Sequence, residues 1–159
     1  MIQRVQSLYL LAAFVLCVAC MSLPLGFYVT TDGVRVASLT NLWFAWRPEF
    51  VVDGMVARTM RPWALFVLLL LVSSITLVNI FLYRRRALQM RVSSFCMVVL
   101  AGWYAAYAFF AYVLGHGLEA SFRPNWSAAF PLCALIFLYL AFRAIHKDEA
   151  LVRSLDRLR

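Results

Sequence analysis

The sequence predicts an all-α membrane protein: a four-transmembrane-helix bundle with a small extracytoplasmic β-hairpin and a cytoplasmic C-terminal helical extension. Apolar residues make up 65% of the 159 residues and charged residues 14%, against about 45–50% and about 25% in soluble domains. The apolar residues also form long uninterrupted blocks, and ~20 such residues in a helix cross a ~30 Å hydrocarbon core. No block alternates as the strands of a membrane barrel do, which favours helices.

The four blocks divide a single integral membrane domain into its predicted spans, residues 8–25, 63–83, 92–114 and 128–145. The first block, which follows Arg4, also resembles a secretory signal peptide, and Cys20 resembles the lipidated cysteine of a lipoprotein signal. However, Cys17 stands where such a signal has Leu, and the apolar run continues past Cys20. We therefore expect the first helix to be retained.

Basic residues predict the orientation of the bundle. Ten of the 15 Lys and Arg residues lie in the N-terminal tail, the second connection and the C-terminal end. The second connection alone contains Arg84, Arg85, Arg86 and Arg91. Because cytoplasmic loops are enriched in Lys and Arg, both termini of this multi-pass membrane protein are expected in the cytoplasm. Topology and contact with membrane lipid explain the net charge of +8, so nucleic acid is not an expected partner.

Residues 26–61 form a long periplasmic loop that is predicted to contain structure. Asp32 and Gly33 lie between segments rich in β-branched residues, which predicts a hairpin with a two-residue type I′ turn. Trp43 and Trp46 follow it, and further tryptophans begin the second and fourth spans. An aromatic belt that anchors the protein at the interface accounts for them. The alternative is that the hairpin and tryptophans form a docking surface for a partner.

The spans contain few groups that carry chemistry. They lack Asp, Glu, Lys and Arg until Arg143, whereas pumps and coupled transporters usually place an ionisable group in the membrane. His116 and His146 are expected at opposite ends of the bundle and so cannot ligate one haem iron. No cofactor, metal site or catalytic residue is predicted, and the protein is expected not to be an enzyme.

Cys17 and Cys20 are the only redox candidates, although weak ones. Their spacing places both thiols on one face of the first helix, as a membrane thiol or quinone oxidoreductase requires. A relay needs a second pair, but Cys96 and Cys133 belong to different spans, and Cys133 is expected to be buried. Packing among the helices is the favoured role for all four.

Polar residues within the spans are predicted to join helices. Ser73, Thr76 and Asn79 recur every three residues along the second span and are expected to hydrogen-bond to a neighbouring helix. Tyr104 and Tyr107 are expected near mid-membrane, where their hydroxyl groups need partners. Those partners are backbone carbonyl groups or polar residues of the second span, or alternatively a lipid or quinone headgroup.

The cytoplasmic tail, residues 146–159, is predicted to extend the fourth helix. Leu151, Leu155 and Leu158 form an apolar stripe, and Glu149 precedes Arg153 by four residues, as in a helical ion pair. The stripe has three possible destinations: the Arg-rich connection, the membrane surface or a protein partner. The residues proposed to contact a partner, in the tail or the Trp-rich loop, are Trp43, Trp46, Leu151, Arg153, Leu155, Arg157 and Leu158.

Three segments, MIQRVQSLYLLAA, FLYRRRALQMR and RAIHKDEALVRSLDRLR, resemble an uncharacterised membrane-protein family of Bacteroidota, domain-of-unknown-function family 4293. The resemblance covers the whole chain and implies a four-helix protein of a Gram-negative inner membrane, without implying an activity. His146 and Ala87 differ from the charged residues of these motifs, so neither is expected to act through its charge. We expect a non-enzymatic structural or accessory subunit of an envelope assembly, and a thiol or quinone oxidoreductase using Cys17 and Cys20 is the alternative.

Overall fold

The computed structural model describes residues 2–42, 44–46, 62–82, 85–118 and 120–156, with the backbone alone for 2–4, 44–46, 117–118 and 151–156. Within this part of the chain it has four long helices, all apolar enough to cross a membrane. They are α1 (Ile2–Ser22), α3 (Trp63–Phe81), α4 (Arg86–Leu118) and α5 (Phe130–Asp156). The prediction of four membrane helices is therefore confirmed, and so is a helical extension of the fourth as far as Asp156.

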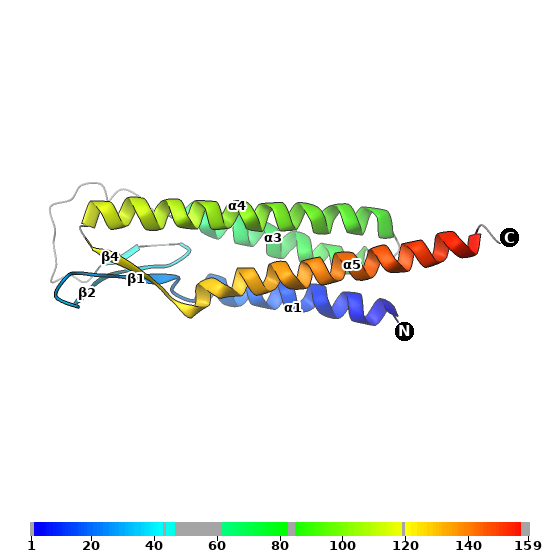
Figure 1. Cartoon of the computed structure of the whole chain (residues 1–159), viewed down its shortest axis with the longest axis horizontal. Coiled ribbons are helices and arrows are strands. Elements are labelled where there is room, and N and C mark those ends of the chain that lie inside the picture. The colour runs from blue at the N-terminus through cyan, green and yellow to red at the C-terminus, as the bar shows by residue number, and fades with distance from the viewer. Residues whose placement is uncertain (1, 43, 47–61, 83–84, 119, 157–159) are drawn as a thin grey trace.

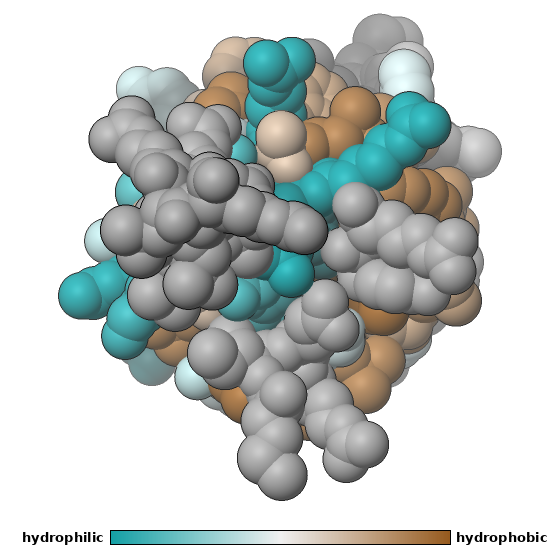
Figure 2. Space-filling model, turned by 90° about the vertical axis from the view of Figure 1, so that its right-hand side faces the viewer, coloured by the Kyte–Doolittle hydropathy of each residue, from teal (hydrophilic) through white to brown (hydrophobic). Residues whose placement is uncertain are grey.

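The helices form an up-and-down bundle, in which α1 packs between α3 and α5, and α4 packs on the other sides of the same two helices. Both termini and the α3–α4 connection lie at one end, which we call the tail end (Figure 1). Figure 2 shows hydrophilic side chains gathered over the tail end, with apolar side chains on the flanks behind them. The opposite end, which we call the sheet end, carries the strands of the described residues (Figure 1).

Apolar side chains cover the outside of the bundle as well as its inside. Phe81, Val98 and Tyr112 are 73%, 69% and 67% exposed, whereas Leu10, Leu69 and Leu138 are fully buried. Water is an unfavourable solvent for so much exposed apolar surface, and hydrocarbon is a suitable one. These features are those of a multi-pass membrane protein.

A four-stranded antiparallel sheet of order β3-β2-β1-β4 covers the sheet end. Its strands are β1 (Gly26–Val29), β2 (Arg35–Leu39), β3 (Phe44–Trp46) and β4 (Ser121–Pro124). Strand β4 follows α4 and pairs with β1 from the first loop, so that Gly26 lies opposite Pro124. The sheet thus joins the first and last connections of the bundle, whereas the sequence predicted only the β1–β2 hairpin.

The β1–β2 hairpin has a wider turn than predicted. Gly33 donates a backbone hydrogen bond to Thr30 at 2.9 Å, and Thr30 donates one to Val34 at 3.0 Å. Three residues, not two, therefore make the loop, and Gly33 (φ 77°) is its left-handed position. The predicted two-residue type I′ turn was therefore wrong. A single glycine in the left-handed conformation also fits the last position of a three-residue loop, so the Asp-Gly signal did not distinguish the two loop lengths.

Polar contacts set the register between α3 and α4. The Asn79 side-chain amide donates to Ser93 Oγ at 2.9 Å, and the Thr76 hydroxyl lies 3.8 Å from the sulfur of Cys96. The prediction that α3 hydroxyl and amide groups bond to a neighbouring helix is confirmed at these two positions. Ser73 instead donates to the Leu70 carbonyl oxygen of its own helix at 3.0 Å.

The two longest helices extend past the bundle at opposite ends (Figure 1). Helix α4 has 33 residues and α5 has 27, which correspond to about 50 Å and about 40 Å at 1.5 Å per residue. A hydrocarbon core of ~30 Å accounts for only part of either length. Helix α4 overhangs at the sheet end and supports the sheet, while α5 overhangs at the tail end.

Candidate functional site

The link between α1 and β1 fixes the sheet to the bundle. Helix α1 ends at Ser22, and the backbone carbonyl groups of Pro24 and Leu25 are left to find other donors. The Leu25 carbonyl oxygen accepts from the Asn125 backbone N–H at 2.9 Å and from the Tyr107 hydroxyl at 3.2 Å. The Pro24 carbonyl oxygen accepts from the Asn125 side chain at 3.0 Å and from the Ser127 hydroxyl. This link is therefore held from α4 and from the segment just before α5, the short 3-10 helix η1 (Trp126–Ala129) with its N-cap residue Asn125.

An aromatic cluster fills the space between the sheet and α4. Tyr28 of β1 is fully buried, and its ring lies 5.0 Å from that of Phe122 in β4. Phe122 meets Tyr107 edge to face at 5.9 Å, and Tyr107 stacks on Trp103 at 5.4 Å. The Tyr28 hydroxyl lies 3.4 Å from the Ala111 carbonyl oxygen. Burial, and to a smaller extent the nearby Tyr107, raises the pKa of Tyr28, which therefore remains a neutral donor.

The cluster requires a glycine in β1. A Cβ atom at Gly26 would lie 2.4 Å from a ring carbon of Phe122 and 2.9 Å from the Arg123 carbonyl oxygen. Both distances are far below van der Waals contact, so the absence of a side chain at Gly26 allows β4 and its aromatic ring to lie over β1.

The two α4 tyrosines both bond to the backbone. Tyr104 donates to the Ala128 carbonyl oxygen at 2.8 Å, and Tyr107 donates to that of Leu25. Backbone carbonyl groups were one of the predicted partners, and this prediction is confirmed. Tyr104 thus lies level with Ala128, in the short 3-10 helix η1 that precedes α5. The expected depth of the two tyrosines in the membrane stays a prediction.

The candidate redox cysteines lie in the core. Cys17 and Cys20 are 1% and 0% exposed, and Cys96 is also buried. The buried side chain of Asn41 donates to the Cys20 carbonyl oxygen at 2.7 Å and closes the sheet over this end of α1. Cys133 is exposed on α5, contrary to the expectation that it is buried. Both thiols of the Cys17 and Cys20 pair thus face protein, out of reach of a dissolved exchange partner.

A polar cluster closes the tail end of the α3–α4 pair. Gln89 donates to the Asn79 carbonyl oxygen at 3.2 Å, and Ser93 donates to the Gln89 carbonyl oxygen at 2.9 Å. On the adjacent side, Arg86 forms an ion pair with Asp148 of α5 at 3.1 Å. This ion pair connects the α5 overhang to the Arg-rich connection. The destination of the leucine stripe stays a prediction.

The predicted partner and topology residues separate into the two ends of the molecule. Arg85, Arg86 and Arg91 lie at the tail end. The backbone of Trp46 lies in β3, and the backbones of Leu151, Arg153 and Leu155 lie in α5. Trp43, Arg84, Arg157 and Leu158 lie outside the described residues. The roles proposed for these residues stay predictions.

In the described part of the chain, no three His, Cys, Asp or Glu side chains come together as metal ligands would. His116 lies near the sheet end of α4, against Tyr112, and His146 lies near the tail end of α5, against Phe142. Their separation agrees with the prediction that they occupy opposite ends.

Sequence reasoning missed the residues that fix the sheet. Tyr28, Asn41, Asn125 and Ser127 act through bonds to backbone atoms distant in the sequence. The available signal was polar side chains directly beside the ends of apolar blocks, where a helix end leaves carbonyl groups unpaired. The ion pair of Asp148 left no sequence signal, because its partner comes from another helix.

Comparison with known proteins gives one family. A family model described as "Domain of unknown function (DUF4293)" matches residues 2–158. A search of curated proteins finds no significant match.

Proposed function

Because the chain belongs to the DUF4293 family over nearly its whole length, and that description specifies no activity, we propose a function from its geometry. It is a non-enzymatic structural or accessory subunit of an envelope assembly in the inner membrane. The tail end faces the cytoplasm and the sheet end faces the periplasm, in agreement with the excess of Arg at the tail end. Partners bind through the Trp-rich loop or through the tail.

The fixed sheet carries this proposal. Tyr28 of β1 bonds to α4, and Tyr107 of α4 bonds to Leu25, the residue before β1. At the edge of the sheet, Trp46 is the last residue of β3, Trp43 directly precedes β3 in the sequence, and the rest of the long loop follows β3. A loop that leaves a rigid platform loses less conformational entropy on binding than one that leaves a mobile hairpin. A sheet fixed on top of a membrane bundle is therefore suited to presenting a loop to another protein.

Burial of Cys17 and Cys20 also supports a structural role over the competing thiol or quinone oxidoreductase. Thiol exchange requires an accessible thiolate, and both sulfur atoms pack among apolar side chains. Replacing both with Ala is expected to leave cellular thiol status and growth unchanged. A rise in unpaired periplasmic thiols in that variant would favour the oxidoreductase.

Affinity purification in mild detergent, followed by mass spectrometry, tests the proposal. The wild-type protein is compared with two double variants, Trp43→Ala with Trp46→Ala in the loop and Leu151→Ala with Leu155→Ala in the tail. Trp126→Ala is the matched control, since this tryptophan is 67% exposed and lies outside both segments. A partner is expected to purify with wild type and control and to be lost from one double variant. Recovery of the wild-type protein alone would refute the proposal.

A reporter enzyme fused after Arg159 tests the orientation. The proposal predicts that a reporter that works only in the cytoplasm is active in this fusion, and that one that works only in the periplasm is inactive. The opposite result would reverse the assignment of the two ends.

A further inference from the structure

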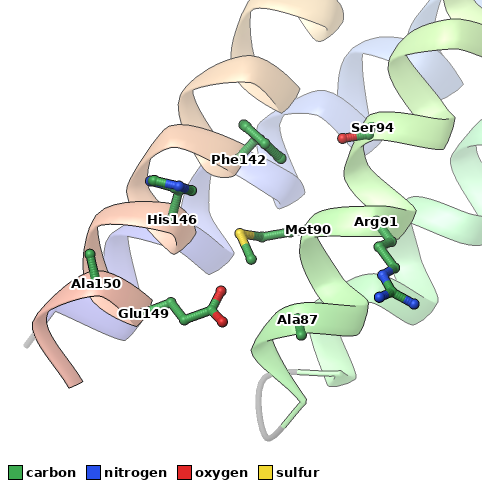
Figure 3. A pocket seen from close by; sticks show the side chains of 8 residues that line it. All are labelled: Ala87, Met90, Arg91, Ser94, Phe142, His146, Glu149 and Ala150. Carbon is green, nitrogen blue, oxygen red and sulfur yellow. The ribbon is translucent and has the colours of Figure 1, made fainter. Parts of the chain in front are cut away.

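A cleft of about 400 Å³ opens between the first turns of α4 and the α5 segment 142–150, at the tail end. Its α4 wall includes Met90, Arg91 and Ser94, and its α5 wall includes Phe142 and Glu149 (Figure 3). On each helix the lining residues fall within successive turns, three or four positions from one turn to the next, so each wall is one helix face. Ala87 completes the α4 wall, and His146 and Ala150 complete the α5 wall. The small side chains of the two alanines leave space between the faces unfilled.

The lining changes from apolar to charged along the cleft. Phe142 and Ser94 lie toward the middle of the bundle, whereas Glu149 lies toward the tail end, reaching across toward α4 (Figure 3). The Met90 side chain reaches the other way, toward α5 (Figure 3). Arg91 provides the single basic side chain of the α4 wall. The cleft is therefore amphipathic, with its apolar part deep and its charged part shallow.

The charged part lies where the apolar run of α5 gives way to charged residues. The apolar run of α5 ends with Ile145, and the next residues include Lys147, Asp148 and Glu149. Beyond the deep end of the cleft, the same helix faces continue as exposed apolar side chains, with Phe95, Val98 and Tyr139 being 52%, 69% and 51% exposed. A molecule in the cleft would thus have its polar part at the interface and its apolar part along a hydrocarbon-facing surface.

We propose that this cleft binds one phospholipid with a zwitterionic headgroup that ends in a primary amine. Its phosphate contacts Arg91, its ammonium group contacts Glu149, and the start of an acyl chain lies between Met90 and Phe142. The opposite charges of Arg91 and Glu149 match the two charges of such a headgroup. An anionic lipid would bring its negative charge close to Glu149, and a quaternary choline group has no N–H to donate to that carboxylate.

The volume fits this occupant. Small-molecule sites usually measure about 300–1,000 Å³, so 400 Å³ accommodates a headgroup and glycerol but not a whole lipid. The acyl chains must leave through the deep end of the cleft, where the exposed apolar surface begins. A peptide helix of a partner, which needs a groove several turns long, does not fit this volume.

Native mass spectrometry of the purified full-length protein tests the proposal. The protein is titrated with phosphatidylethanolamine, phosphatidylcholine and phosphatidylglycerol of identical acyl chains, and bound lipid is counted per protein. One favourable charge at the membrane surface contributes about fivefold in affinity. We expect phosphatidylethanolamine to be retained about fivefold more than either of the others. Equal retention of the three lipids, or preferred retention of phosphatidylglycerol, would overturn the proposal.

Two variants then assign the contacts. Glu149→Gln should abolish the preference for phosphatidylethanolamine over phosphatidylglycerol, and Arg91→Gln should weaken both about fivefold. Arg143→Gln is the matched control, because this exposed α5 arginine lies outside the cleft lining and should change neither. Equal effects of Arg91→Gln and Arg143→Gln on lipid retention would overturn the proposal. A wild-type spectrum that shows lipid-free dimers would also overturn it, because a second copy of the chain would then fill the cleft.

Discussion

Replacing Gly26 with Ala should loosen the sheet without unfolding the bundle. The new Cβ atom would lie 2.4 Å from a Phe122 ring carbon and 2.9 Å from the Arg123 carbonyl oxygen. Carbon atoms require about 3.5 Å, so the ring must move by about 1 Å. The ring alone cannot relieve the overlap, because the second clash is with the backbone of β4. Overpacking of this kind typically costs about 1–3 kcal/mol.

Hydrogen exchange measured by mass spectrometry in lipid nanodiscs tests this magnitude. If the cost falls on local opening of the sheet, amides of β1 and β4 should exchange about 5- to 150-fold faster. Amides in the middle of α3 should be unchanged. Gly102→Ala is the matched control, because its Cβ would meet nothing within 4 Å. Exchange in β1 and β4 that stays within twofold of wild type would refute the packing argument.

A second substitution separates the clash from other effects of Ala in a strand. In a Phe122→Ala background the ring is absent, so Gly26→Ala should cost less than it does in the wild-type protein. Phe122→Ala alone should also weaken the sheet, by about 0.5–1.5 kcal/mol for each lost contact with Tyr28 and Tyr107. Strictly additive effects of the two substitutions would show that Phe122 is not the residue Gly26 accommodates.

Three further predictions concern single contacts. In a double-mutant cycle of Asn79→Ala and Ser93→Ala, unfolding in SDS should give a coupling energy of about 0.6 kcal/mol; zero coupling would show that their 2.9 Å hydrogen bond is not stabilising. Asp148→Asn removes the carboxylate that pairs with Arg86, and a partly exposed pair contributes about 0.2–1 kcal/mol. Hydrogen exchange in the α5 overhang should therefore rise by up to about fivefold, and unchanged exchange would mean that other contacts hold it. Tyr107→Phe keeps the ring but loses the hydroxyl that donates to the α1–β1 link, so the free energy of unfolding should fall by about 0.5–1.5 kcal/mol, and a stability equal to wild type would contradict this.

The helices could be predicted because the bilayer imposes a simple requirement on them. An apolar block of about 20 residues satisfies it whatever its neighbours are, and so all four blocks became helices. The ends were less predictable. Apolar character extends to Leu25, but α1 ends at Ser22, because Pro24 provides no N–H to continue the helix and Leu25 hydrogen-bonds to β2 instead.

The sheet was only half predictable for a different reason. The β1–β2 hairpin is local, and its Gly33 turn left a signal in the sequence. Strand β4, with the sequence SFRP, has only four residues, ends in proline and pairs with residues almost a hundred positions earlier. Such pairing depends on the bundle bringing two loops together, which no local pattern records.

In the candidate sites, too, local features could be predicted and contacts between distant segments could not. Tyr107 was correctly expected to need a partner, but its acceptor could be identified only once β1 was placed against α4. The cleft between α4 and α5 exists because the facing sides of these two helices separate near the tail end. The positions of Arg91 and Glu149 in the sequence do not reveal that separation. By contrast, the shared face of Cys17 and Cys20 was expected from their spacing on a helix, and their burial was expected because small thiols pack well among apolar helices.

Helix α4 is one unbroken rod about 50 Å long, with the sheet attached near one end and the ion pair to α5 at the other. A rod of this kind behaves as a lever. Tilting it by about 10° around its centre would displace its two ends by about 4 Å in opposite directions. A load applied to the sheet on one side of the bilayer would therefore shift Arg86, and with it the final turns of α5, on the other side.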